Sequence, residues 1–156
     1  MAHNSKGMGP NFVPAYQVSG IPYVTSSHGP AVVGTAVQKI TFPQVTRFFV
    51  VNNIGSNILR VGFTENGVDG GPDESGAERL RWFQLNGGQI SPRLEIRCKE
   101  LYFRAVSNTD KTGFSLIAGL SGVPSNQFPT LTGSLLYSGS DGEPLGAPVA
   151  KFEGVG

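Results

Sequence analysis

Short segments in which apolar and polar residues alternate constrain the fold of this chain most strongly. One such segment places Leu59, Val61 and Phe63 on one face of an extended chain and Arg60 and Gly62 on the other. Alternation with a period of two is typical of a strand that has one buried face. The chain also holds 22 glycines and 11 prolines, and no window of twelve residues shows the periodicity of an amphipathic helix. The sequence therefore predicts strands joined by turns.

Further segments of this kind follow one another along the chain. The strand predictions are Ile21–Ser26, Thr35–Phe42, Val45–Val51, Asn57–Thr64, Arg81–Leu85, Arg93–Lys99, Leu101–Ala105, Phe114–Ala118 and Leu131–Tyr137. Their spacing of about ten residues predicts an all-β sandwich, and two facing sheets of about four strands each give a single jelly roll. An immunoglobulin-like sandwich without a cysteine pair is the structural alternative. The Asn and Gly residues of the turn at 52–56 predict that its flanking strands form an antiparallel hairpin.

The ends of the chain differ in composition from its middle. Residues 1–19 and 138–156 are rich in Gly, Pro and Ser and are expected to form extended N- and C-terminal arms around a sandwich of residues 20–137. No apolar stretch is long enough to span a membrane, so no membrane insertion is expected. The start of the chain has no basic segment followed by an apolar run, so no signal peptide is expected.

Acidic and basic residues are segregated along the chain. Residues 65–78 hold five acids and no base, whereas residues 79–111 hold seven bases and three acids. The basic block is interleaved with Trp82, Phe83 and Tyr102, a combination that can stack on and neutralise a nucleic acid. The two blocks nearly cancel and the net charge is only +1, so pairing between them, within one chain or between neighbours, is the preferred interpretation and no direct nucleic-acid contact is expected.

Two long stretches, Gly7–Gln38 and Thr112–Ser140, contain no Lys, Arg, Asp or Glu. Interface cores are depleted in charge, so these stretches are suited to burial against another protein. Glycine-rich loops and buried strands would explain them equally well. Under the interface interpretation, residues 12–16 and 128–131 are expected to anchor the arms to neighbouring subunits.

Residues able to carry catalysis or bind metals are few. The two histidines, His3 and His28, lie in Gly- and Pro-rich surroundings, and the single cysteine, Cys98, lies on the apolar face of its predicted strand as a small buried residue. Glu95 alternates with arginines and is better explained by cross-strand charge pairing than by a paired-carboxylate site. The acidic block lacks the spacing of a calcium-binding loop. We therefore expect no enzyme activity, no cofactor and no metal.

Four runs of residues resemble small single-jelly-roll capsid proteins of large icosahedral DNA viruses. They are Gly-Ile-Pro-Tyr-Val-Thr-Ser-Ser at 20–27, Ile-Thr-Phe-Pro-Gln-Val-Thr-Arg-Phe-Phe-Val-Val-Asn-Asn at 40–53, Leu-Arg-Val-Gly-Phe-Thr at 59–64 and Ser-Leu-Ile-Ala-Gly-Leu at 115–120. The resemblance implies a structural protein of the virion, assembled in the host cell, without cofactor or catalytic residues. It implies either the penton subunit of the five-fold vertices or a minor capsid (cement) protein. The acidic block at 65–78 has no counterpart in the pattern and leaves that choice open.

As a penton subunit, the chain is expected to form a homopentamer that contacts neighbouring major and minor capsid proteins. A five-fold ring is built from head-to-tail contacts between two different patches of each subunit. The candidate interface residues are Phe12, Tyr16, Glu65, Asp69, Asp73, Arg79, Arg81, Trp82, Phe128 and Leu131. The alternative belongs to a different functional class, that of binding modules. It is a β-sandwich that binds a glycan or peptide through Trp82, Tyr102 or Tyr137.

Overall fold

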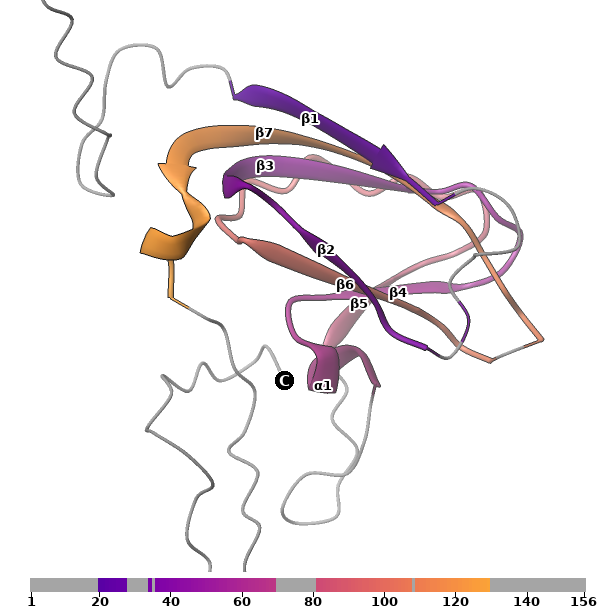
Figure 1. Cartoon of the computed structure of the whole chain (residues 1–156). Helices are drawn as coiled ribbons and strands as arrows, with labels where there is room; N and C mark the ends of the chain where they lie inside the picture. Colours follow the sequence, from indigo (N-terminus) through magenta and orange to yellow (C-terminus); the bar gives the residue numbers. More distant parts are fainter. Residues whose placement is uncertain (1–19, 28–33, 35, 70–80, 108, 130–156) are drawn as a thin grey trace, which may run out of the picture.

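The computed structural model describes residues 20–27, 34, 36–69, 81–107 and 109–129, which form two antiparallel sheets that face each other (Figure 1). The three-stranded sheet has the order β1 (Ile21–Ser26), β7 (Phe114–Pro124), β3 (Gln44–Asn53). The four-stranded sheet has the order β2 (Gln38–Thr41), β6 (Glu100–Ala105), β4 (Leu59–Gly62), β5 (Trp82–Leu85). Two short helical segments, α1 (Glu65–Asp69) and η2 (Ser125–Gln127), complete the described elements. The predicted all-β class is confirmed.

The core lies between the two sheets because each strand turns its apolar alternate residues inward. The rings of Phe103 on β6 and Phe114 on β7 stack across the interior, with centroids 4.0 Å apart and planes 3° from parallel. The buried cluster comprises Phe42, Phe49, Val51, Leu59, Val61, Leu85, Cys98, Leu101, Phe103, Ala105, Phe114, Leu116, Ala118 and Leu120. The facing predicted from alternation in β4, β6 and β7 is confirmed, and Cys98 is buried as expected.

An extended segment, residues 89–98, runs antiparallel along the free side of β3. Backbone bonds join Phe49 and Leu94 in both directions, at 3.0 and 2.9 Å, and the Asn53 N–H donates to the Gln89 carbonyl at 2.9 Å. The predicted strand at 93–99 is therefore present only as an irregular edge with isolated bridges. Side chains replace part of its ladder: the Cys98 N–H donates to Thr46 Oγ1 and the Val51 N–H donates to Ser91 Oγ.

The hairpin predicted around the turn at 52–56 is wrong, because β3 and β4 belong to different sheets. The buried Asn53 side chain organises this crossing between the sheets. Its Nδ2 donates to the carbonyls of Asn57, Leu85 and Asn86 at 2.7, 3.0 and 3.0 Å. Its Oδ1 accepts from the hydroxyl of Thr112 at 2.6 Å and from a backbone N–H of the turn, that of Gly55. A turn signal fixes the local bend but not the sheet that the next strand joins.

The first residues of the acidic block form α1, a helix that the sequence did not predict. Thr64 caps this helix, since its Oγ1 accepts from the Gly67 N–H at 3.1 Å. Val68 is fully buried against β4, where a Cβ at Gly62 would overlap with the Val68 side chain. A five-residue helix is too short to leave a periodic pattern in the sequence.

The remaining boundaries agree in part with the sequence-based expectations. β1 has its predicted bounds, Ile21–Ser26, whereas the strand predicted over 35–42 is shorter, at Gln38–Thr41. The predicted strand at 131–137 and both arms, 1–19 and 138–156, lie outside the described residues. In the part of the chain that the structure describes, no helix combines the length and apolar character needed to cross a membrane.

Candidate interaction surfaces

The outer face of the four-stranded sheet is polar and charged. Register places Lys39 beside Tyr102, and Arg60 directly opposite Arg104, with all four side chains on the face away from the core. Helix α1 lies on the same side of this sheet, at the opposite end of the layered structure from β1 (Figure 1). We call this surface the charged face.

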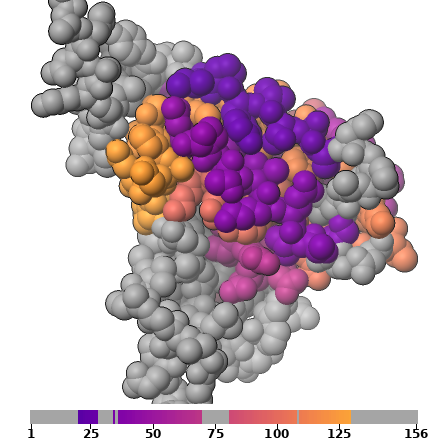
Figure 2. Space-filling model, in the orientation of Figure 1, coloured from indigo at the N-terminus to yellow at the C-terminus, as the bar shows by residue number. Residues whose placement is uncertain are grey.

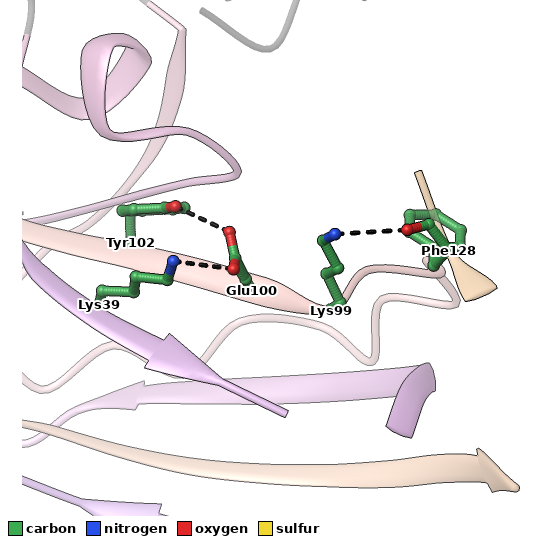
Figure 3. Close-up of polar contacts among 5 residues, drawn as sticks. All are labelled: Lys39, Lys99, Glu100, Tyr102 and Phe128. Atoms are coloured by element: carbon green, nitrogen blue, oxygen red, sulfur yellow. Dashed lines mark hydrogen bonds and ion pairs between the residues drawn. The ribbon is translucent and has the colours of Figure 1, made fainter. Parts of the chain in front are cut away.

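At one part of the charged face, three titratable side chains form a connected group (Figure 3). Glu100 accepts from Lys39 Nζ at 2.8 Å and from the Tyr102 hydroxyl at 2.8 Å. The hydrogen bond to Glu100 raises the pKa of Lys39, while burial and the bond to Glu100 raise the pKa of Tyr102. Partial burial opposes ionisation of Glu100, but its hydrogen bonds with Lys39 and Tyr102 outweigh burial and lower its pKa. At neutral pH the group is therefore an ion pair between Lys39 and Glu100, with the neutral phenol of Tyr102 hydrogen-bonded to Glu100.

The neighbouring Lys99 links the charged face to the segment after β7. Its Nζ donates to the Phe128 carbonyl at 3.3 Å, as Figure 3 also shows. Phe128 itself is half-buried, and its N–H donates to the carbonyl of Ser125, the first residue of η2. This contact fixes the point at which the chain leaves the described part of the sandwich.

Near α1 the charged face holds two further contacts. Arg104 pairs with the Asp69 carboxylate at 3.1 Å and also donates to the Asp69 carbonyl. The Arg60 guanidinium lies 4.1 Å from the centroid of the Trp82 ring, a cation–π arrangement. The first contact is an intrachain ion pair between the acidic and basic blocks, as the preferred interpretation of their charges predicts.

The middle of the outer face of the three-stranded sheet is apolar, whereas the adjacent row of Ser26, Ser115 and Asn52 is polar. The register aligns Val50 of β3, Ile117 of β7 and Val24 of β1 in one row across the sheet. Val24 is 67% exposed and Ile117 is 52% exposed. We call these three residues the apolar row. At the 89–98 edge of this face, Arg93 and Glu95 pair at 3.0 Å.

A second line of residues borders the apolar row. Phe48 lies over β7 at a position where a Cβ on Gly119 would overlap with its ring. The Arg93 guanidinium covers that ring at 4.0 Å from its centroid. Pro22 of β1 pairs in register with Gly119 on the other side. Two neighbouring apolar rows therefore cross all three strands, and Figure 2 shows the indigo residues of β1 at the surface.

Cys98 carries little nucleophilic potential in this fold. Burial raises the pKa of its thiol to about 11, and the thiol lies 3.3 Å from Thr46 Oγ1. A thiol with this pKa holds almost no thiolate at neutral pH. No group of three or more His, Cys, Asp or Glu side chains able to hold a metal ion occurs among the described residues.

Five of the predicted interface residues fall within the described parts of the chain. Glu65 and Asp69 lie in α1, and Arg81 joins them because its N–H donates to the Gly67 carbonyl at 3.4 Å. Trp82 begins β5 and pairs in register with Gly62, under α1. The structure thus gathers these four at one end of the charged face. Phe128 lies apart from them, beside Lys99. The others, Phe12, Tyr16, Asp73, Arg79 and Leu131, lie outside the described residues.

Sequence reasoning missed the two best-defined surface features. Alternation in β7 marked Ile117 as an outward residue, but its neighbours Val24 and Val50 become apparent only with the register of three strands. Lys39 and Glu100 lie 61 positions apart, and no local pattern joins them. A scan against protein-family models and searches of curated proteins and of solved structures found no match for this chain.

Proposed function

We propose that this chain is a structural subunit of an icosahedral viral capsid, that it forms the five-fold vertices, and that its fold is a single jelly roll. Strand order supports the jelly roll. With the 89–98 segment counted as a strand beside β3, the orders are β1-β7-β3-(89–98) and β2-β6-β4-β5. Two Greek keys wound into a pair of four-stranded sheets produce this arrangement, which is common in viral capsid domains.

The apolar row on the outer face of the three-stranded sheet is the observation that carries the structural role. Val24 and Ile117 are more than half exposed at neighbouring positions of one row. A contiguous apolar surface of this kind marks a contact with another protein rather than a surface meant for water. The resemblance of four sequence runs to small capsid proteins supplies the proposed identity of the assembly.

Two of the three aromatic residues named for a glycan site, Trp82 and Tyr102, are engaged within the chain, and Tyr137 lies outside the described residues. The Arg60 guanidinium stacks on the Trp82 ring. Tyr102 is only 9% exposed, and its hydroxyl is bonded to Glu100. Both contacts favour a structural use of these rings over stacking on a sugar.

Light scattering coupled to size-exclusion chromatography, with electron microscopy of the same fractions, tests the proposal. A vertex protein is expected to form closed rings of five subunits, in isolation or upon addition of the shell proteins with which it is expressed. Binding to preformed shells as single subunits would replace the vertex role by the cement role. A protein that binds a glycan array, and loses that binding in the Trp82→Ala variant, would overturn the structural proposal.

A further inference from the structure

Strand β1 is the outer edge of the three-stranded sheet (Figure 1), and within the described residues β7 is its sole strand partner. The direction of its backbone groups follows from one bond: the Ser27 N–H donates to the Phe114 carbonyl at 2.9 Å. In an antiparallel pair, alternate residues direct both backbone groups to the same neighbour. Odd-numbered residues therefore bond to β7, and the backbone groups of Pro22, Val24 and Ser26 point to the open edge.

This edge lacks the usual protection against strand pairing. Edge strands in soluble proteins commonly carry Lys or other charges that prevent another strand from docking. Residues 20–27 contain no charged side chain. Pro22 is the single interruption, and it occupies a position whose missing N–H costs no bond to β7. Val24, at the centre of the edge, is 67% exposed.

We propose that two copies of this chain pair edge to edge and antiparallel along β1, about a two-fold axis at Val24. In this register Val24 lies opposite Val24 of the second copy, and Pro22 lies opposite Ser26. Each Val24 N–H donates to the opposite Val24 carbonyl, and each Ser26 N–H donates to the opposite Pro22 carbonyl. The two three-stranded sheets thereby become one continuous sheet.

The chemistry of the edge favours a second copy as the occupant. In an isologous contact, identical residues of the two copies lie opposite each other at the axis. A charged residue there would repel the same residue of the second copy, and β1 contains no charged residue. The pairing also joins the two apolar rows, because side chains opposite each other in an antiparallel pair share one face. Val24 is buried against the second Val24, and Ile117 continues the row on both sides.

The apolar rows fix the register. The missing Pro22 N–H costs one bond per copy both in the proposed register and in one shifted toward the start of β1, with Pro22 opposite Val24. The shifted pairing would, however, offset the two Val24 side chains and the apolar rows to which they belong. A pairing shifted the other way would place Pro22 opposite position 28, beyond the end of β1, and would separate the two Val24 side chains. The axis at Val24 keeps the contact within the strand and the apolar rows in line.

Cysteine cross-linking tests this register in the full-length chain. In the proposed pair the two Val24 Cα atoms are about 5.5 Å apart, within the range that a disulfide spans. The Val24→Cys variant is expected to become a disulfide-linked dimer on mild oxidation. Ser26→Cys is the matched control, because its two copies would lie more than about 10 Å apart along the strands. Native Cys98 is buried and does not compete. Equal cross-linking of both variants, or none with Val24→Cys, would overturn the proposal.

Sedimentation equilibrium provides the second test. The Val24→Lys variant places two ammonium groups on the axis and is expected to weaken dimerisation at least tenfold. Val106→Lys, the same change at a residue that is 42% exposed elsewhere, is the matched control and is expected to leave the dimer unchanged. An unchanged dimer in Val24→Lys would refute the contact. The two-fold contact does not depend on the capsid proposal. If rings of five subunits persist in Val24→Lys, the proposed vertex function stands without the β1 contact. If the wild-type chain forms the dimer but no rings, the β1 contact stands without the vertex function.

Discussion

At the scale of single residues, buried polar side chains hold the ends of the sandwich together. Asn53 joins β3 to the loops beside β4, β5 and β7 through both atoms of its amide. Ser27 acts similarly at the end of β1, since its N–H and Oγ bond the Phe114 carbonyl and N–H. Buried polar groups without partners are costly, so each of these side chains is needed once its neighbours are buried.

Replacement of Asn53 by alanine is expected to lower the free energy of unfolding by about 2–4 kcal/mol, because several buried carbonyls and the Thr112 hydroxyl lose their partner together. Urea denaturation measures the change. The adjacent Asn52 points away from the core and is half-buried, so Asn52→Ala is expected to cost less than about 0.5 kcal/mol. Similar losses in both variants would contradict the role assigned to Asn53.

The Lys39–Glu100–Tyr102 group predicts a stability maximum between mildly acidic and alkaline pH. The folded pKa of Glu100 is lowered, so its contribution is present above about pH 4.3 and is lost as the pH falls through the folded pKa. The pKa values of Lys39 and Tyr102 are raised, so their contributions are present below about pH 10 and are lost as the pH rises.

Glu100→Gln is expected to flatten the acid side of this curve by no more than about 1 kcal/mol, since Lys39 is partly exposed and solvent screens the pair. Thermal denaturation from pH 3 to 11 measures the difference. Tyr102→Phe keeps the ion pair and removes only the hydroxyl bond, so it should retain most of the acid-side slope. A Glu100→Gln curve parallel to that of the wild type would refute the assignment.

At the scale of elements, α1 depends on the absence of a side chain on β4. The buried Val68 occupies the space in which a Cβ of residue 62 would lie. The Arg104–Asp69 pair and the Thr64 cap hold the two ends of the same helix. The acidic block is therefore attached to the sandwich by its first five residues.

Gly62→Ala is expected to cost about 1–3 kcal/mol of folding free energy, because the new methyl group displaces Val68. The double variant with Val68→Ala restores the space. The double variant is expected to lose less folding free energy than the two single variants lose in sum. A double-mutant cycle measured by urea denaturation determines the difference. Additive losses would show that Gly62 and α1 are not in contact.

Prediction from sequence succeeded where the information is local and failed where it is not. Alternation identified the inward residues of β4, β6 and β7, since strand periodicity is a property of consecutive residues. The partner of β4 was missed because Asn52 and Gly55 favour a bend irrespective of where the chain goes next. Lys39 and Glu100 meet through pairing of β2 with β6, and that register depends on the whole core rather than on either segment.

At the scale of the whole molecule, Cys98 reports on the integrity of the sandwich. Its thiol is fully buried and its pKa is raised to about 11, so labelling requires opening of the fold. Phe103 lies in the same buried cluster, stacked on Phe114 from the opposite sheet. Removal of the Phe103 ring increases the exposure of the Cys98 thiol only if the two described sheets unfold together.

Phe103→Ala is expected to cost about 3–5 kcal/mol and hence to speed thiol labelling of native protein at least about a hundredfold. Reaction with a chromogenic disulfide at pH 8 measures the rate. Val106→Ala removes a partly exposed side chain and serves as the control, with labelling within about threefold of the wild type. Rapid labelling of the unmodified protein would refute the burial of Cys98.

The central position of β7 in the three-stranded sheet has a consequence for biosynthesis. β1 and β3 flank β7 on either side and pair with it rather than with each other. On the ribosome, β3 can pair with residues 89–98 first, whereas β1 has no partner among the described strands until residues 114–124 have left the exit tunnel. During that interval Val24 belongs to no sheet, and translation must deliver nearly the entire described region before the layer that contains it can close.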